Sequence, residues 1–177
     1  MTTPAVRGPL RYGLAVVTAL AALALTGDAR ADAGPKIVPA KLDTVLAAIR
    51  KPGARAVLVN VWATWCDPCR EEMPDLLRVY RAHKDRGLRL VLVSADDEDT
   101  RAEAQRFLAS QGVDFPSYLK TGDDMAFING LDPRWSGALP ASFLFDGRGR
   151  VQQFWQRKIT TDELTTKLSE ILRRRTQ

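Results

Sequence analysis

The stretch Ala56-Val-Leu-Val-Asn-Val-Trp-Ala-Thr-Trp-Cys-Asp-Pro-Cys-Arg-Glu-Glu-Met-Pro-Asp-Leu-Leu77 places two cysteines between two recognisable elements. Its first seven residues, 56–62, are almost all apolar and rich in valine. Such a run predicts a buried β-strand. From Cys69 to about Arg86 the apolar residues recur on one face of a helix, and Gly87 predicts its end. The cysteines therefore lie where a buried strand passes into a helix.

The position of the two cysteines favours redox chemistry. The first turn of a helix has free N–H groups and the positive end of the helix dipole. A sulfur placed there is stabilised as a thiolate, which is the reactive form of cysteine. We expect Cys66 to point outward and act as the nucleophile, and Cys69, one turn later, to be partly buried and to resolve the intermediate. Pro68 fits the first helical turn, because that turn needs no N–H from it.

Two structural roles compete with the redox role for this pair. A structural disulfide here would close a loop of only four residues, for which chain entropy gives about 2 kcal/mol. Half of a zinc site would need a second cysteine pair or two histidines, but the chain has only two cysteines and a single histidine, His83. We expect His83 to lie on the surface of its helix. The redox role is therefore the favoured interpretation.

The same signals continue along the rest of the chain. We expect helices at 42–49, 100–110, 123–131 and 160–175, and strands at 88–94, 115–120, 141–145 and 151–155. Asp123 should cap the helix that follows it, and 146–149 should join the last two strands as a hairpin. Alternation early in the chain and a hairpin late predict an α/β fold, with a mixed central sheet flanked by helices on both faces.

Composition is that of one folded domain. The chain has 177 residues, of which 45% are hydrophobic and 27% charged, and this balance excludes a disordered chain. The net charge is +5, and the basic residues are spread out apart from Arg173-Arg174-Arg175. At the end of a predicted helix, such a cluster is better explained by its favourable interaction with the helix dipole than by nucleic-acid binding. We expect a monomer with no cofactor, no metal and no nucleic-acid partner.

The N-terminus has the three parts of a secretory signal peptide. Arg7 and Arg11 precede an apolar run at 14–25, and Ala29-Arg-Ala31 offers a small-residue cleavage site. As a helix the run would extend about 18 Å, short of the membrane core of about 30 Å. We expect a cleaved signal peptide at 1–31, a flexible lead-in at 32–40 and one domain at 41–177. The alternative is an uncleaved segment that anchors the chain to the inner membrane.

Two motifs carry a resemblance to a known family. Asn60-Val-Trp-Ala-Thr-Trp-Cys-Asp-Pro-Cys-Arg-Glu-Glu-Met-Pro74 and, later, Leu139-Pro-Ala-Ser-Phe-Leu-Phe-Asp146 resemble the thioredoxin superfamily, and more closely its exported TlpA/ResA-type branch. The resemblance runs from about Leu42 to the C-terminus. It implies a thioredoxin-like fold with a central insertion, here at about 112–131, and thiol–disulfide exchange with other proteins.

The resemblance also implies roles for single residues. Cys66 matches the nucleophile of the family and Cys69 its resolving thiol. Pro140 matches a cis-proline, and the cis bond would place the backbone of Leu139 beside the disulfide, where it can pair with a substrate strand. Only about 5–6% of X-Pro bonds in folded proteins are cis, so the residues alone do not predict one.

An acidic residue of this branch matches Glu72, three residues after Cys69. A carboxylate with a raised pKa could accept a proton from Cys69 as that thiol resolves the mixed disulfide. The alternative is a solvated helix residue, like Glu71 beside it. The buried aspartate of ordinary thioredoxins is matched here by Asn60, which cannot take the proton, and this strengthens the case for Glu72.

The remaining residues near the cysteines should tune or line the site. Trp65 is expected at the exposed rim beside Cys66, where its aromatic face can receive a substrate chain. Trp62, Trp135 and Trp155 are expected to pack in the core. Asp67 places a negative charge beside Cys66 and disfavours its thiolate. We therefore predict a reducing potential, closer to the value of about −270 mV of thioredoxin than to about −120 mV.

Together these expectations describe a periplasmic thiol–disulfide reductase. The resemblance implies a membrane electron donor of the DsbD/CcdA type and disulfide-containing protein substrates, namely apocytochrome c or a copper-site protein. One alternative is an oxidase or isomerase of disulfide formation. A copper carrier is a second, with thin support from Met73 and His83. A peroxidase is less expected, because its reactive cysteine usually follows a Pro/Thr-rich loop and here Trp65 precedes it.

Overall fold

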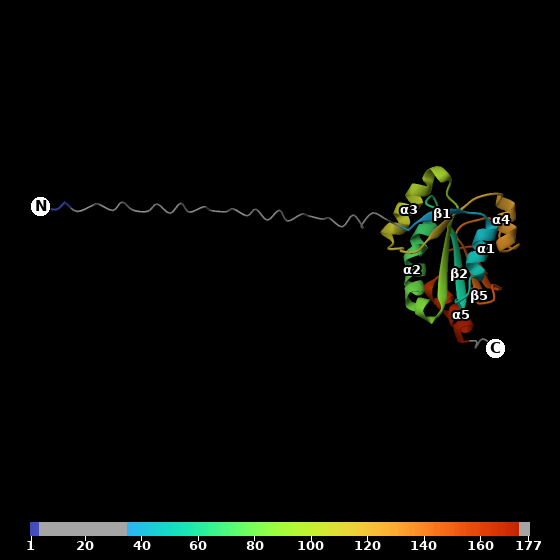
Figure 1. Cartoon of the computed structure of the whole chain (residues 1–177). Helices are drawn as coiled ribbons and strands as arrows, with labels where there is room; N and C mark the ends of the chain where they lie inside the picture. The colour runs from blue at the N-terminus through green and yellow to red at the C-terminus, as the bar shows by residue number, and fades with distance from the viewer. Residues whose placement is uncertain (4–34, 174–177) are drawn as a thin grey trace. The chain divides into compact units, whose positions relative to one another are not determined.

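The computed structural model describes residues 1–3 and 35–173 (Figure 1). The predicted signal peptide at 1–31 lies outside the described residues, apart from its first three. Among the described residues, no helix combines the length and the apolar character that a membrane span requires.

Six strands form one mixed sheet in the order β1-β4-β3-β2-β5-β6. Their bounds are β1 Ile37–Ala40, β2 Ala56–Trp62, β3 Leu88–Ser94, β4 Ser117–Lys120, β5 Ala141–Asp146 and β6 Val151–Trp155. Strands β1, β4, β3 and β2 run parallel, whereas β5 is antiparallel to β2 and forms a hairpin with β6. One edge of the sheet, the one formed by strand ends, therefore contains the carboxyl ends of β2 and β3, the start of β5 and the end of β6.

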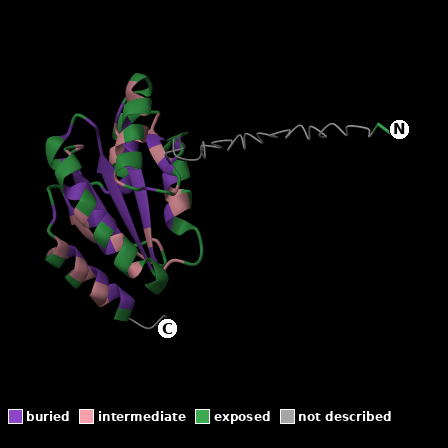
Figure 2. Ribbon diagram, turned by 90° about the vertical axis from the view of Figure 1, so that its left-hand side faces the viewer, coloured by how far each residue is buried: buried purple, intermediate pink, exposed green. Residues whose placement is uncertain are grey.

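Helices cover both faces of this sheet. Their bounds are α1 Leu42–Arg50, α2 Asp67–His83, α3 Arg101–Ser110, α4 Asp124–Leu131 and α5 Thr161–Arg173, with two short 3-10 helices, η1 Lys84–Arg86 and η2 Glu98–Thr100. The apolar faces of α2, α3 and α5 share one core cluster, and those of α1 and α4 share another. Figure 2 shows buried strands between helices whose outer faces are exposed. The predicted mixed sheet flanked by helices is confirmed, and the expected insertion at 112–131 supplies β4 and α4.

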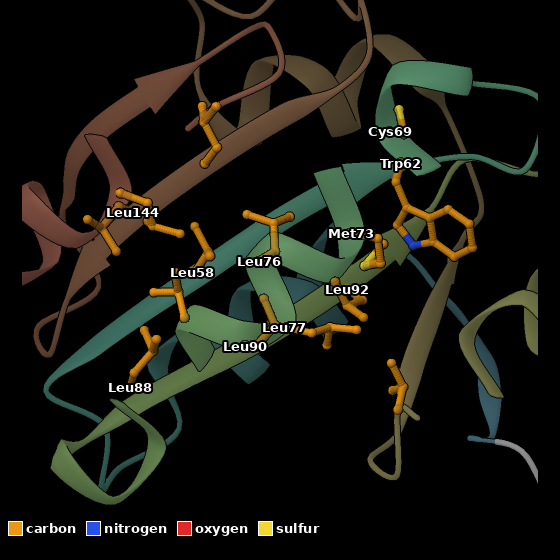
Figure 3. Close-up of a cluster of buried hydrophobic side chains, with 14 of the residues drawn as sticks. Leu58, Trp62, Cys69, Met73, Leu76, Leu77, Leu88, Leu90, Leu92 and Leu144 are labelled. Atoms are coloured by element: carbon orange, nitrogen blue, oxygen red, sulfur yellow. The ribbon is translucent and has the colours of Figure 1, made fainter. Parts of the chain in front are cut away.

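The central strand β2 is buried at all seven positions because both of its faces are covered. Its side chains alternate between the faces: Leu58 joins the cluster under α2, whereas Val57 and Val59 join the cluster under α1. On the α2 side the core extends from Leu88 at one end of the strands to Cys69 at the other (Figure 3). The packing of α2 on this core fixes its N-terminus at the carboxyl end of β2.

The expectation of a flexible lead-in at 32–40 is wrong for the last four residues, because Ile37–Ala40 form strand β1. This strand pairs in parallel with β4, with Ile37 opposite Ser117. Ile37 and Ala40 are buried, and Pro39 is tolerated because β1 is an edge strand. Four residues are too few for a clear alternating pattern, so the strand exists only through its pairing with β4.

The other expected elements are found within a few residues of their predicted bounds. Gly87 follows η1 with a φ of 99°, a left-handed conformation that glycine adopts without strain. The Asp123 side chain accepts a hydrogen bond of 2.7 Å from the backbone N–H of Ala126, so the predicted cap of α4 is confirmed. The hairpin between β5 and β6 is also confirmed.

Candidate active site

A disulfide joins Cys66 and Cys69 at the N-terminus of α2, with Cα atoms 5.3 Å apart. Cys66 is the N-cap residue, Asp67 begins the helix, and Pro68 lies in the first turn. The Cys66 carbonyl accepts the backbone N–H of Arg70 at 3.1 Å. Both sulfurs therefore lie at the positive end of the α2 dipole, the environment expected to favour a thiolate once the bond is reduced.

The two cysteines are more deeply buried than the spacing alone suggests. Cys66 retains 6% of its exposed surface and Cys69 none, so the outward-pointing Cys66 of the sequence prediction is not found in the oxidised state. The bond draws the Cys66 sulfur toward Cys69, and both residues belong to the α2 core cluster, against which Leu139 also packs. Of the two cysteines, Cys66 is the more exposed.

A buried carboxylate that the sequence did not single out anchors the loop before the cysteines. Both oxygens of Asp96 accept the backbone N–H of Thr64 at 3.1 Å, and the Thr64 hydroxyl donates to Asp96 Oδ1 at 2.5 Å. The Ser94 hydroxyl donates to Asp96 Oδ2 at 2.5 Å. The signal that could have found Asp96 is its position two residues after the strand predicted at 88–94.

The peptide bond between Leu139 and Pro140 is cis, as the resemblance implied. Val61 pairs with Ala141, so Pro140 lies at the level where β2 ends and the cysteine loop begins. Pro140 is buried and Leu139 is half-buried. The structure thus brings Leu139 and Pro140 to the same edge of the sheet as the disulfide.

Glu72 lies inside the protein, one helical turn after Cys69. It is fully buried, so the solvated alternative is wrong. Its Oε1 accepts the side-chain amide of Asn60 at 2.9 Å, and its Oε2 accepts the backbone N–H of Ile159 at 3.0 Å. Residues three apart on a helix share a face, so Glu72 and the buried Cys69 point to the same side of α2.

Burial raises the pKa of Glu72 to about 7, because the charged carboxylate loses its hydration. The hydrogen bonds from Ile159 and Asn60 and the charge of Lys158 oppose this rise. The adjacent Glu71 is exposed, and its pKa is lowered by its ion pair with Lys158, whose Nζ lies 2.8 Å from Oε2. Two neighbouring glutamates therefore have opposite pKa shifts, and only Glu72 can exchange a proton near neutral pH.

Asn60 connects Glu72 to strand β5. Its side-chain amide also donates to the Ser142 hydroxyl at 3.0 Å, and all three residues are buried. Asn60 lies within β2 rather than at its end. This direct contact makes Asn60 a neighbour that sets the environment of the Glu72 carboxyl.

The aromatic residues divide as predicted between rim and core. Trp65 is 67% exposed, beside the disulfide, whereas Trp62, Trp135 and Trp155 are buried. Trp62 packs against Phe107, with ring centroids 5.2 Å apart. Asp67 is exposed, and its carboxylate lies 3.7 Å from the guanidinium of Arg70. An exposed aromatic side chain and a charged pair thus lie next to the cysteines along the chain.

Candidate copper ligands do not gather around the cysteines. Met73 is buried in the core under α2. His83 is half-buried at the far end of α2, about 21 Å along the helix from Cys69, and its Nδ1 contacts the Val79 carbonyl at 2.9 Å. Among residues 35–173 no group of three or more His, Cys, Asp or Glu side chains is placed to hold a metal ion.

Comparisons with known proteins agree with this geometry. The chain is 27% identical over 145 residues to the thiol-disulfide oxidoreductase ResA of Oceanobacillus iheyensis, covering 82% of this chain and 72% of that protein. It is 37% identical over 116 residues to the thiol:disulfide interchange protein HelX of Rhodobacter capsulatus, covering 65% and 60%. The crystal structure of a DsbF homologue from Corynebacterium diphtheriae matches with a TM-score of 0.60 at 25% identity, covering 71% and 75%.

Residues 41–154 match the family model described as the AhpC/TSA family, which is more than half of the chain. The matched range contains the disulfide, Glu72 and the cis-proline. The chain belongs to the AhpC/TSA family and is a thioredoxin-like thiol–disulfide oxidoreductase of the ResA/HelX type.

Proposed function

We propose that the protein reduces disulfides of other proteins outside the cytoplasm, with Cys66 as the nucleophile and Cys69 as the resolving thiol. The observation that carries the proposal is the buried Glu72, one turn after Cys69, with a pKa of about 7. A proton acceptor on the buried side of the pair is needed when Cys69 becomes the attacking sulfur. Exchange in that order ends with the substrate reduced.

The reaction has two displacement steps. The Cys66 thiolate attacks one sulfur of the substrate disulfide, which breaks that bond, forms a mixed disulfide and releases the second substrate sulfur as a thiolate. Cys69 then loses its proton to Glu72 and attacks the Cys66 sulfur. The remaining substrate sulfur leaves, and each substrate thiolate takes up a proton. Two electrons pass to the substrate and the Cys66–Cys69 disulfide is formed.

Glu72 can serve as the base because Asn60 suits either of its protonation states. The Asn60 amide N–H donates to Glu72 Oε1 at 2.9 Å, a hydrogen bond that suits the charged carboxylate. The Oδ1 atom of Asn60 is buried and makes no hydrogen bond within the described residues. Rotation of the amide would let this oxygen accept the proton of a neutral Glu72, at the cost of the hydrogen bond from Asn60 to Ser142.

The substrate is proposed to bind at the rim around Cys66. The exposed side chain of Trp65 offers an apolar platform next to Cys66. Leu139, held by the cis bond to Pro140 at the same edge, offers backbone groups to an extended substrate segment. These groups would align a substrate disulfide with Cys66.

The direction of electron flow and the partners belong to the same proposal. Asp67 places a negative charge next to Cys66, which disfavours the thiolate and hence supports a reducing potential. The dithiol would be restored by a membrane donor of the DsbD/CcdA type. The resemblance to ResA and HelX supports a periplasmic location and apocytochrome c or a copper-site protein as the substrate.

Trapping tests the proposal directly. A Cys69→Ser variant, produced in the periplasm, should hold its substrate in a mixed disulfide through Cys66, visible as a thiol-sensitive band shift. The matched Cys66→Ser variant should trap nothing and should not reduce insulin. If the captured proteins carry neither a disulfide nor paired cysteines, reduction of protein substrates is excluded.

The redox potential separates a reductase from an oxidase or isomerase. Equilibration with glutathione buffers should place the Cys66–Cys69 couple nearer to about −270 mV than to about −120 mV. A value above about −150 mV would reverse the proposed direction and favour disulfide formation.

A further inference from the structure

The end of the domain opposite the dithiol is strongly basic. Five side chains, those of Arg50, Lys51, Lys84, Arg86 and Arg173, are exposed there and form no ion pair with any residue in 35–173. We call this group the basic end. It lies at the carboxyl ends of α1, α2 and α5 (Figure 1). Cys66 is the N-cap residue at the other end of α2.

Contacts between the loops show that these charges gather in one place. The backbone N–H of Arg55 donates to the Gly87 carbonyl at 2.8 Å, and its guanidinium donates to the Leu172 carbonyl. A Cβ atom placed on Gly149 would lie 3.3 Å from Cγ of Arg50, so the two residues are close neighbours. The loops after α1 and η1, the β5–β6 turn and the end of α5 thus form one continuous surface.

Helix dipoles alone do not account for this charge. Each of the three helix carboxyl ends contributes about half a negative charge. Two further arginines already donate hydrogen bonds to carbonyl groups at these ends. Arg89 donates to the carbonyls of Ala48 and Lys51 at the end of α1, and Arg55 donates to the end of α5. The nearby acids among the described residues are Asp85, Asp146 and Glu170; Asp146 is paired with Arg150 at 2.9 Å and Glu170 with Lys167 at 3.3 Å. A positive excess remains.

The types of side chain at the basic end distinguish between classes of binding partner. Among residues 35–173 the exposed large apolar side chains are Val38, Trp65 and Met125, and none lies at the basic end. A protein interface usually buries apolar anchors, and single-stranded nucleic acid usually stacks on aromatic side chains. An anionic bilayer needs neither, because clustered lysines and arginines alone attract it.

Negative charge at the opposite end of the domain would orient the domain on a negative surface. The loop after β3 at the dithiol end carries the exposed carboxylates of Asp97 and Asp99, which a negative surface repels. The seven residues of β2 separate the two ends by about 20 Å. We propose that the basic end docks the domain on an anionic phospholipid surface and holds the dithiol facing away from it, toward the soluble domains of its substrates and of its electron donor.

Vesicle binding tests this inference. We expect the full chain to bind vesicles of about 30% phosphatidylglycerol in phosphatidylcholine at least about tenfold more tightly than pure phosphatidylcholine vesicles, with the difference lost at high salt. The triple variant Lys51→Gln, Lys84→Gln, Arg86→Gln should lose about tenfold in affinity for the anionic vesicles.

A charge-matched control makes the result specific. The variant Lys36→Gln, Lys41→Gln, Arg106→Gln removes three exposed charges elsewhere and should stay within about twofold of the parent protein. The N-terminal segment is the same in all three proteins, so its own membrane affinity cancels in the comparison. Insulin reduction by the basic-end variant should be unchanged, which shows that it folds.

Three results would overturn the proposed binding, and a fourth would overturn the proposed orientation. The first is equal binding to neutral and anionic vesicles, and the second is an equal loss of binding in both triple variants. The third is a basic end that binds a DNA duplex but shows no preference for anionic vesicles, which would assign it to nucleic acid. Vesicle-bound protein should also reduce insulin at the rate of free protein, and a loss of activity on binding would contradict the proposed orientation.

Discussion

At the scale of single residues, two adjacent glutamates on α2 show how position decides chemistry. Glu71 points to solvent and pairs with Lys158, whereas Glu72 is buried and held by Asn60 and Ile159. Both have the same side chain, yet the pKa of Glu71 is lowered by Lys158, and the pKa of Glu72 is raised to about 7 by burial. Only the buried carboxylate can act as a base whose charge changes near neutral pH.

A Glu72→Gln variant should therefore be a slow reductase. Glutamine cannot accept the proton of Cys69, so we expect insulin reduction at pH 7 to fall at least about tenfold. The parent rate should rise as pH increases through about 7, where Glu72 becomes ionised, and the variant should lose this rise. The matched Glu71→Gln variant should keep both the rate and the pH profile, and equal profiles for Glu72→Gln and the parent protein would remove Glu72 from the mechanism.

At the scale of elements, the loop between β2 and α2 is held from the side by the end of β3. Asp96 accepts hydrogen bonds from the Thr64 backbone, the Thr64 hydroxyl and the Ser94 hydroxyl. Thr64 lies two residues before Cys66, so the tie fixes the path by which the chain enters the catalytic turn. The parallel pairing of β2 with β3 is what brings the two segments together.

Removal of this tie should cost stability. Asp96→Ala leaves the buried donors of Thr64 and Ser94 without their acceptor, so we expect the free energy of unfolding to fall by about 2–4 kcal/mol. Urea titration of the variant and the parent protein measures this. The exposed neighbour provides the control, because Asp97→Ala should change stability by no more than about 0.5 kcal/mol. Equal effects at the two positions would show that the tie carries no stability.

Strand β1 makes a second prediction at this scale. Ile37 is buried in the α2 core cluster, whereas Val38, next to it, is exposed. Ile37→Ala should destabilise the domain by about 2–4 kcal/mol, because it leaves a cavity under the sheet edge. Val38→Ala should change stability by less than about 0.5 kcal/mol. If both variants unfold at the same denaturant concentration as the parent protein, β1 does not contribute to the core.

At the scale of the whole molecule, the buried acid links stability to pH. The pKa of Glu72 is about 7 in the folded protein and 4.5 is its usual value. A raised folded pKa means that the stabilisation is complete below the unfolded pKa and is lost as pH rises through the folded one. The pKa of Asp132 is shifted the other way, because Arg134 donates hydrogen bonds to it, so its contribution is lost only in stronger acid.

We therefore expect the free energy of unfolding to fall between about pH 4.5 and pH 7, by at most about 3 kcal/mol from Glu72. Denaturant unfolding at several pH values measures the slope. The same series on Glu72→Gln should lack this fall, because glutamine does not titrate. Parallel curves for the two proteins would mean that Glu72 has the same pKa in the folded and unfolded chains.

The sequence by itself determined the order of the main elements, the place of the dithiol at the start of α2 and the exposed rim at Trp65. These depend on periodicity and spacing within short segments, which propensity and the helix dipole act on directly.

Strand β1, the tie from Asp96 to Thr64 and the environment of Glu72 were decided only by the tertiary structure. The partners of those hydrogen bonds are 32 residues apart for Thr64 and Asp96, and 12 and 87 apart for Glu72 with Asn60 and Ile159. No local pattern records such contacts, because they form only when the sheet brings distant segments to one edge.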